Sequence, residues 1–162
     1  MSNWVNSDGL LVKLGTVEAT AQKGGATNIS GDKREIVFDI TMTELTSASA
    51  IVQDNLIIPK SARIEEVEIE VLTACTGATA VLNLGTVRSD RTTTYDENGL
   101  VDAATVASLD TAGKRLNIIY GSDYDGAQIG TTLAYNGLIV ADYDTAAFTA
   151  GLIRVRVKYF FI

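Results

Sequence analysis

The chain of 162 residues contains no histidine. Histidine is the side chain most often used for general acid–base catalysis near neutral pH, and it is a common metal ligand. Its absence excludes serine triads, cysteine–histidine dyads and histidine metal sites. The sequence also lacks a Gly-x-Ser-x-Gly elbow and a phosphate-binding loop. A pair of carboxylates, as in glycosidases, is the one catalytic arrangement left, and we expect a protein that is not an enzyme and needs no cofactor.

Cysteine and basic residues are also scarce. The single cysteine, Cys75, excludes a disulfide within the chain, and we expect it to be a small buried side chain at the end of a strand. Only 13 Lys and Arg stand against 20 Asp and Glu, which gives a net charge of −7. Nucleic acids and anionic membranes both attract basic surfaces, so neither is expected as a partner.

Long apolar runs are missing as well. No stretch is long enough to span a bilayer as a helix, and the first residues lack the basic and apolar regions of a secretory signal. We therefore expect a protein that is made in a cytoplasm and does not use the general export route.

The last eleven residues form the clearest pattern that is present. From Leu152 to Ile162, apolar side chains fall on one parity and Arg154, Arg156 and Lys158 on the other. This period of two is typical of a strand with one face on a core and one face in water. Because the strand continues to an apolar chain end, we expect that end to be buried in a sheet rather than frayed.

Similar short strands recur along the chain. They are predicted over residues 36–40, 56–58, 64–71, 80–87, 116–120 and 137–143. A change of parity near Glu65 indicates a bulge or a strand start there. The alanine-rich stretch from Leu100 to Leu109 does not alternate and predicts one short helix. The fold class expected is all-β: an antiparallel β-sandwich, jelly-roll-like, with one short helix and an extended N-terminal arm.

The domain organisation follows from composition. Residues 1–33 include a stretch rich in Gly, Ala, Thr and Asn, which is typical of a connector, so they are assigned to an arm, and residues 34–162 are assigned to the sandwich body. The arm nevertheless carries Trp4, Val5, Leu10 and Leu11. A tryptophan is costly to leave in water, so we expect these residues to dock on the body or on a neighbour.

Two charged stripes suggest how strands pair. Acidic residues occur at every second position from Glu66 to Glu70, and basic residues do so in the C-terminal strand. Opposite charges across a ladder stabilise it by roughly 0.2–1 kcal/mol per pair and favour one register. If the two strands pair antiparallel within the chain, Glu66 lies opposite Lys158, Glu68 opposite Arg156 and Glu70 opposite Arg154. The alternative is that both stripes face other subunits.

Binding residues are less clearly marked. Oxygen donors cluster at residues 122–126 and 142–144, but they lack the spacing of an EF-hand, and Asp and Gly more often simply make turns. Tyrosines in or beside predicted loops could form a sugar platform, although exposed tyrosines are equally typical of protein interfaces, which we favour. The candidate protein-contact residues are Trp4, Val5, Leu10, Leu11, Tyr95, Tyr124 and Tyr135.

Several short segments follow one another in a characteristic order from about residue 58 onward. They are Ile58-Pro59-Lys60-Ser61-Ala62-Arg63-Ile64, Asn83-Leu84-Gly85, Arg88-Ser89-Asp90, Asp96-Glu97-Asn98-Gly99-Leu100, Gly126-Ala127-Gln128-Ile129-Gly130-Thr131 and the run from Ala141 to Gly151. This order resembles that of small virion structural proteins of tailed bacteriophages, of the kind that decorate or cement the head. The resemblance implies a β-sandwich body, self-association and attachment to a capsid lattice.

Two functions from different classes follow. The first is a non-enzymatic virion protein, made in the host cytoplasm, that binds the major capsid protein as a homo-oligomer and stabilises the head. A trimer is the expected oligomer. The alternative is a carbohydrate- or host-surface-binding β-sandwich module of a fibre or tail.

Overall fold

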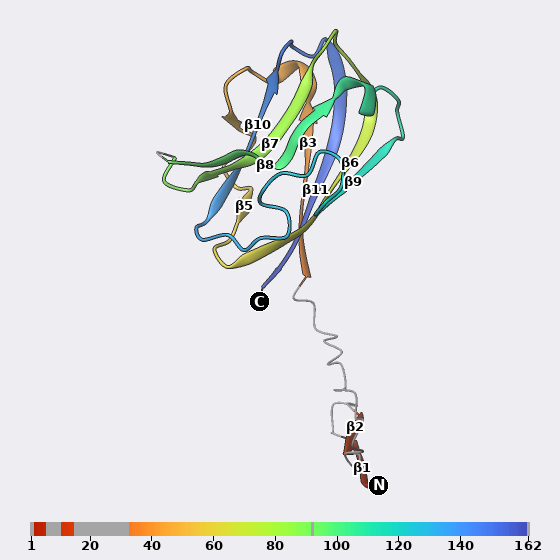
Figure 1. Ribbon diagram of the computed structural model, residues 1–162, viewed down its shortest axis with the longest axis vertical. Coiled ribbons are helices and arrows are strands. Elements are labelled where there is room, and N and C mark those ends of the chain that lie inside the picture. The colour runs from red at the N-terminus through yellow and green to blue at the C-terminus, as the bar shows by residue number, and fades with distance from the viewer. Residues whose placement is uncertain (1, 6–10, 15–32, 92, 162) are drawn as a thin grey trace. The chain divides into compact units, whose positions relative to one another are not determined.

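The computed structural model describes residues 2–5, 11–14, 33–91 and 93–161 (Figure 1). The chain divides into a first unit, residues 1–30, and a second unit, residues 31–162. In the first unit, β1 (Ser2–Val5) pairs antiparallel with β2 (Leu11–Leu14), which places Trp4 opposite Val12. Leu10 lies outside the described residues.

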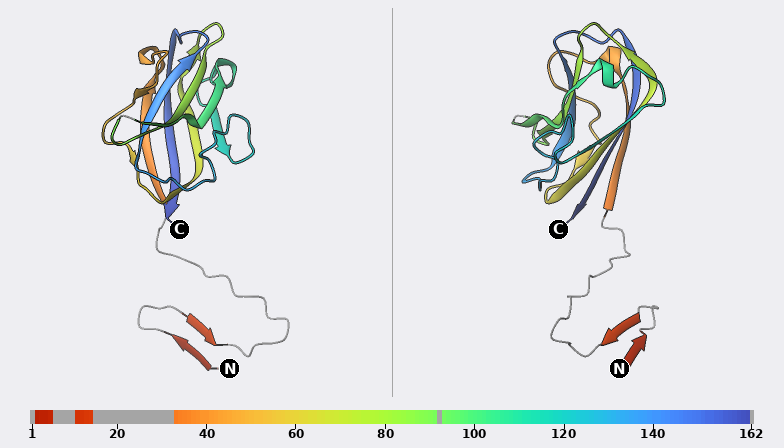
Figure 2. Two further views of the ribbon diagram at one scale, coloured as in Figure 1. Left: turned by 60° about the vertical axis from the view of Figure 1, so that its left-hand side comes forward. Right: turned by 45° about the vertical axis from the view of Figure 1, so that its right-hand side comes forward.

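The second unit is a sandwich of two antiparallel sheets (Figure 2). The first sheet has the order β3 (Lys33–Thr41), β11 (Ala150–Phe161), β6 (Ala62–Thr76) and β9 (Arg115–Ile119). The second has the order β4 (Ala50–Ile51), β10 (Gly137–Asp144), β7 (Val81–Arg88) and β8 (Thr94–Thr105), and β5 (Ile57–Ile58) also pairs with β10.

This connectivity is a jelly roll. If β4 and β5 are taken as one interrupted strand, since both pair with β10, the chain passes between the sheets in the order that defines that fold. The prediction of an antiparallel, jelly-roll-like sandwich is therefore confirmed.

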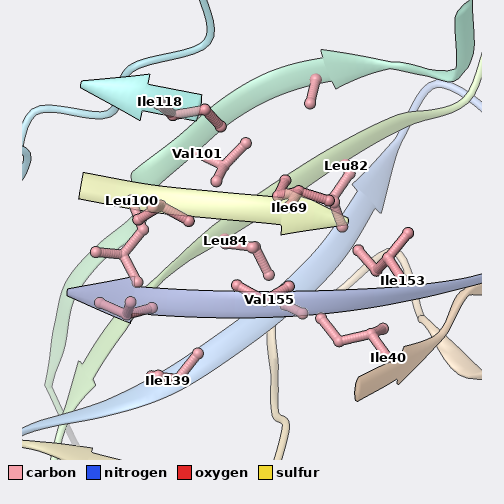
Figure 3. Close-up of a cluster of buried hydrophobic side chains, with 14 of the residues drawn as sticks. Ile40, Ile69, Leu82, Leu84, Leu100, Val101, Ile118, Ile139, Ile153 and Val155 are labelled. Atoms are coloured by element: carbon pink, nitrogen blue, oxygen red, sulfur yellow. The ribbon is translucent and has the colours of Figure 1, made fainter. Parts of the chain in front are cut away.

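The core lies between the sheets and is built by alternation along the strands. Ile153 and Val155 of β11 (Figure 3) are fully buried, and so is Val157, because one face of the strand points at the opposite sheet. Leu82 and Leu84 of β7 meet them from the other side. Burying each such side chain stabilises the fold by roughly 1.5–3 kcal/mol. The C-terminal strand lies between β3 and β6, as predicted, although Ile162 is outside the described residues.

The predicted helix over residues 100–109 is wrong. The chain is strand β8 up to Thr105, followed by a single 3-10 turn over Val106–Ser108. The pairing of β8 with β7 shifts register three times, so bulges interrupt the alternation that identifies a strand. Leu100, Val101 and Ala104 are all buried as a result. A second 3-10 turn covers Met42–Glu44, and no helix among the described residues could cross a membrane.

Candidate interaction surfaces

The outer face of the first sheet carries a ladder of opposite charges in the predicted register. In the pairing of β6 with β11, Glu66 lies opposite Lys158, Glu68 opposite Arg156 and Glu70 opposite Arg154. The register shifts between the Lys158 and Tyr159 pairs, which leaves Glu65 as the bulged residue. Both the intramolecular pairing and the irregularity near Glu65 are therefore confirmed.

Two of the three cross-strand ion pairs form as predicted. Lys158 Nζ lies 3.2 Å from Glu66 Oε2, and Arg156 Nη1 lies 2.9 Å from Glu68 Oε1. Arg154 instead turns to β3, the other neighbour of β11, and donates two hydrogen bonds to Asp39, at 2.8 and 3.0 Å. The two-pronged geometry suits a guanidinium and a carboxylate, and it explains why this third pair differs.

These contacts also shift proton affinities. The hydrogen bond from Arg154 lowers the pKa of Asp39 and raises the pKa of Arg154. Burial acts to lower the pKa of Lys158, but hydrogen bonds and attraction from Glu66 and Glu68 outweigh it and raise that pKa. For Asp39, Arg154 and Lys158, the charged form is therefore the one that the fold favours.

Glu68 is the centre of the ladder. Its side chain is only 12% exposed, and its oxygens lie within 3.5 Å of nitrogens from Arg156, Lys158 and Arg115 of β9. Each basic side chain comes from an adjacent strand of the same sheet, so Glu68 ties β6 to both of its neighbours.

Reversing this charge is expected to lower stability. Glu68→Lys places a fourth cation among three, and we expect it to reduce the free energy of unfolding by roughly 1–2 kcal/mol. Adding Arg156→Glu should recover part of that loss, because the reversed pair attracts again. Urea unfolding of the wild type, both single variants and the double variant measures the coupling, and a coupling of zero would contradict this assignment.

The other flank of this sheet ends in a long free edge. β3 pairs with β11 on one side, and among the described residues no strand pairs with its other side. Val37, on the outer face of β3, is 48% exposed. Such edges offer unpaired backbone N–H and C=O groups to another strand. The edge was not predicted, because strand order is not visible in the alternation of one strand.

A groove of about 280 Å³ lies beside this edge. It runs between the end of β3 and the segment that leads through β4 of the opposite sheet. Its lining comes from both sheets and from the connection between them. The apolar lining residues are Ile40, Leu45, Ala50, Ile51, Val52 and Ala141, and the polar ones are Asp39, Thr41, Glu44 and Gln53. The sandwich is therefore open along its β3–β4 side.

The opposite side is closed by the segment between β9 and β10. Gln128 N donates to Gly99 O of β8 at 2.8 Å, and Leu133 N donates to Ala62 O of β6 at 2.9 Å. The segment thus bonds the backbone of one strand from each sheet. Gly126 lies against the backbone of Asn98 and Gly99 so closely that a Cβ would not fit. Within the described part of the chain, the side beside β3 is the one of these two that offers a long unpaired strand to a partner.

The candidate tyrosines whose side chains are described differ in exposure and in partners. Tyr124 packs against the core, and its hydroxyl lies 3.3 Å from Thr105 Oγ1. Tyr135 is 45% exposed, and the guanidinium of Arg88 lies 3.6 Å from its ring centroid. Tyr95 is part of β8, but its side chain is outside the described set. Tyr120, which is not one of the candidates, is the most exposed of the described tyrosines, at 80%.

The arm residues belong to the first unit. Trp4 and Val5 lie in β1, and Leu11 lies in β2 opposite Val5. The pairing of β1 with β2 brings these three residues into one hairpin. Their role in docking stays a prediction.

Acidic side chains in the candidate calcium loops accept hydrogen bonds within a turn or from neighbouring segments. Asp125 Oδ2 accepts from Gly121 N at 2.7 Å. Asp142 accepts hydrogen bonds from Ser49 and Asn83, and Asn83 also donates to Asp144 at 3.0 Å. In the part of the chain that the structure describes, no three acidic or cysteine side chains form a group suited to a metal ion.

Cys75 is buried at the end region of β6, as expected. Burial raises the pKa of its thiol to about 11, so the thiolate, which is the reactive form, is disfavoured. The fold therefore uses Cys75 as a small apolar side chain.

The fold is shared with chains from bacteriophage capsids. A chain in the capsid asymmetric unit of Cyanophage Pam1 matches with a TM-score of 0.55 and 18% identity, over 93% of this chain and 100% of that one. A chain in the capsid of Ralstonia phage GP4 matches with a TM-score of 0.53 and 20% identity, over 87% of this chain and 92% of that one. No protein-family model and no curated protein matches the sequence.

Proposed function

We propose that this chain is a non-enzymatic structural protein of a phage virion that binds the capsid surface and stabilises the head. The observation that carries the proposal is a fold likeness that extends over the whole of a chain in the Cyanophage Pam1 capsid. The order of short segments that resembles head-decoration proteins supports the same role. Its expected location is the virion, and its expected partner is the major capsid protein.

The surface chemistry agrees with a role in contact between proteins. The acidic net charge is unsuited to binding packaged DNA directly. Among the described residues, the exposed large apolar side chains lie on β3, β5, β9 and the connection between β9 and β10 rather than on one strand; they are Val37, Ile57, Ile119, Tyr120 and Tyr135. A protein seated on a lattice can use several separate contacts, whereas a sugar platform needs its aromatic rings together.

Stabilisation would act by mass action. A protein that binds the assembled shell and not its dissociated parts shifts the equilibrium toward the shell by RT ln(1 + [L]/Kd). A homo-oligomer, with a trimer as the expected number, adds avidity because several copies bind neighbouring capsomers at once. This function needs a stable scaffold and no catalytic group.

Co-sedimentation tests the proposal against its alternative. Purified protein is mixed with heads that lack it and with heads that already carry it, and a glycan array is probed in parallel. We expect the protein to pellet with the depleted heads, to be excluded from the occupied ones and to bind no glycan. Glycan binding without head binding would instead support the fibre or tail module.

Removing residues 1–20 is expected to separate folding from attachment. The deletion includes β1 and β2 but none of the body strands, so the body should keep its melting temperature. Apolar arm residues that become ordered on a partner stabilise binding by the surface they bury. We therefore expect the shortened protein to occupy heads poorly, as measured by co-sedimentation. Full occupancy would contradict a role for the arm.

A further inference from the structure

We infer that the free edge of β3 accepts strand β2 from the arm of a second copy of this chain. The added strand would extend the first sheet beyond β3 and place apolar side chains at the β3–β4 groove. This inference rests on the proposed function, since it supplies the contact by which copies on a capsid hold one another.

The free edge of β3 is long enough to pair with another strand, and no strand of the described residues pairs with it. β3 has nine residues, and in an antiparallel pair alternate residues direct their N–H and C=O groups away from the partner strand. Among the described residues, its backbone hydrogen bonds go to β11 alone. An extended chain laid against such an edge gains affinity from main-chain hydrogen bonds and specificity from alternate side chains.

The groove supplies the place for those side chains. Ile40 of β3 and Ala141 of β10 are buried at its floor, and Leu45, Ile51 and Val52 are partly buried around it. A strand added at the edge continues the inward and outward alternation of its neighbour. Every second side chain would therefore point toward this groove, where the apolar residues of its lining could cover it.

Charge argues against a second β3 as the occupant. An antiparallel β3–β3 contact centred on Val37 would place Glu35 of each copy opposite Asp39 of the other, and like charges directly opposite are destabilising. Each carboxylate also lies near an arginine of its own β11, Glu35 near Arg156 and Asp39 near Arg154, which offsets part of this repulsion.

Strand β2 fits the same edge. Its residues read Leu-Val-Lys-Leu, so an alternating strand carries Val12 and Leu14 on one side and Lys13 on the other. Lys13 is the only charged residue of β1 and β2 and is opposite in sign to Glu35 and Asp39. β2 pairs with β1 on one edge, and no other strand of the described residues pairs with its second edge.

The connecting sequence is long enough to reach another copy. Residues 15–32, which join β2 to β3, could span up to about 60 Å if fully extended. A body of this size has a radius of gyration of about 14 Å. Exchange of a strand between copies links them without any new fold, whereas pairing within one copy would link nothing.

Photocrosslinking of the full-length protein, free and bound to heads, tests the inference. Val12→Cys is labelled with a benzophenone maleimide, and the buried thiol of Cys75 stays unmodified. After irradiation, monomer and dimer bands are separated on a denaturing gel and digested with trypsin. One tryptic peptide, residues 35–60, contains most of β3 and the lining segment through β4. Tyr120→Cys, beyond the opposite edge of the sheet, is the matched control.

We expect the dimer band to contain the probe joined to peptide 35–60, and the control probe to label other peptides. The same crosslink confined to the monomer band would mean pairing within one copy and would overturn the inference, as would labelling elsewhere or no crosslink. Head binding of the Val12→Cys protein is scored separately. If the labelled protein binds heads but gives no crosslink to peptide 35–60, only the strand addition is overturned. If the wild-type protein does not bind heads, the result counts against the proposed function.

Discussion

Deleting residues Tyr159–Ile162 is expected to leave a protein that is insoluble or strongly destabilised. Tyr159 is a buried residue of β11, the strand that lies between β3 and β6. The Phe161 ring lies edge-on to the Tyr159 ring, with the two centroids 6.1 Å apart. Arg34 of β3 covers Phe161, with its guanidinium 5.1 Å from the ring centroid. Full burial of a large apolar side chain is worth roughly 1.5–3 kcal/mol, so Tyr159 contributes about that much and the partly buried Phe161 less. A domain has only about 5–15 kcal/mol in total.

Solubility and thermal unfolding followed by circular dichroism measure this effect. The control is the deletion of residues 1–20, which removes more residues but no body strand. A soluble C-terminal truncation with an unchanged melting temperature would show that the end of β11 does not contribute to the core.

Substituting Gly85 by valine is expected to be the most damaging single change. Gly85 lies in β7, and a Cβ built there would meet Asp96 O at 2.0 Å and Glu97 O at 2.4 Å. Both oxygens belong to the backbone of β8, whose pairing with β7 shifts register at this point. No side-chain rotation can therefore relieve the clash. Overpacking typically costs about 1–3 kcal/mol, and we expect the upper end or more.

Urea unfolding gives the size of the loss. Ala127→Val is a suitable control, because it adds the same kind of bulk at an exposed position. Equal stability of the two variants would mean that β8 does not lie against Gly85 in solution.

The sequence predicts a strand well when one face of that strand is exposed to solvent and the other is buried. The alternation of β11 and of β6 identifies both strands, and their opposite charges identify the register between them. The change of parity at Glu65 even marks the bulge that separates two parts of that pairing. These features are local or involve two strands, so a pattern of period two is sufficient to find them.

The other features of the fold depend on contacts between strands that are distant in the sequence, and no local sequence pattern predicts such contacts. Bulges in β8 bury Leu100, Val101 and Ala104 together, and the resulting apolar cluster resembles a helix in the sequence. The preference of Arg154 for Asp39 follows from β3 lying beside β11, which only the sheet order reveals. The free edge of β3 has the same origin.

The candidate binding residues show the same limit. Composition indicates tyrosines near loops, but burial decides which of them face solvent. Tyr124 packs inward and Tyr135 stacks on Arg88, whereas Tyr120 is the most exposed of the body's described tyrosines. Sequence alone selects Tyr124 and Tyr135 and omits Tyr120, because periodicity does not extend into connections and carries no information about exposure there.

Thermal rupture of phage heads with and without this protein tests the central claim most directly. Heads that lack the protein are heated with a DNA-binding dye, and purified wild-type protein is added back to a second sample. We expect the depleted heads to release DNA at a lower temperature and the added protein to restore the higher one, because it binds only the intact shell. Identical rupture temperatures, with the added protein bound to the heads, would contradict a stabilising role.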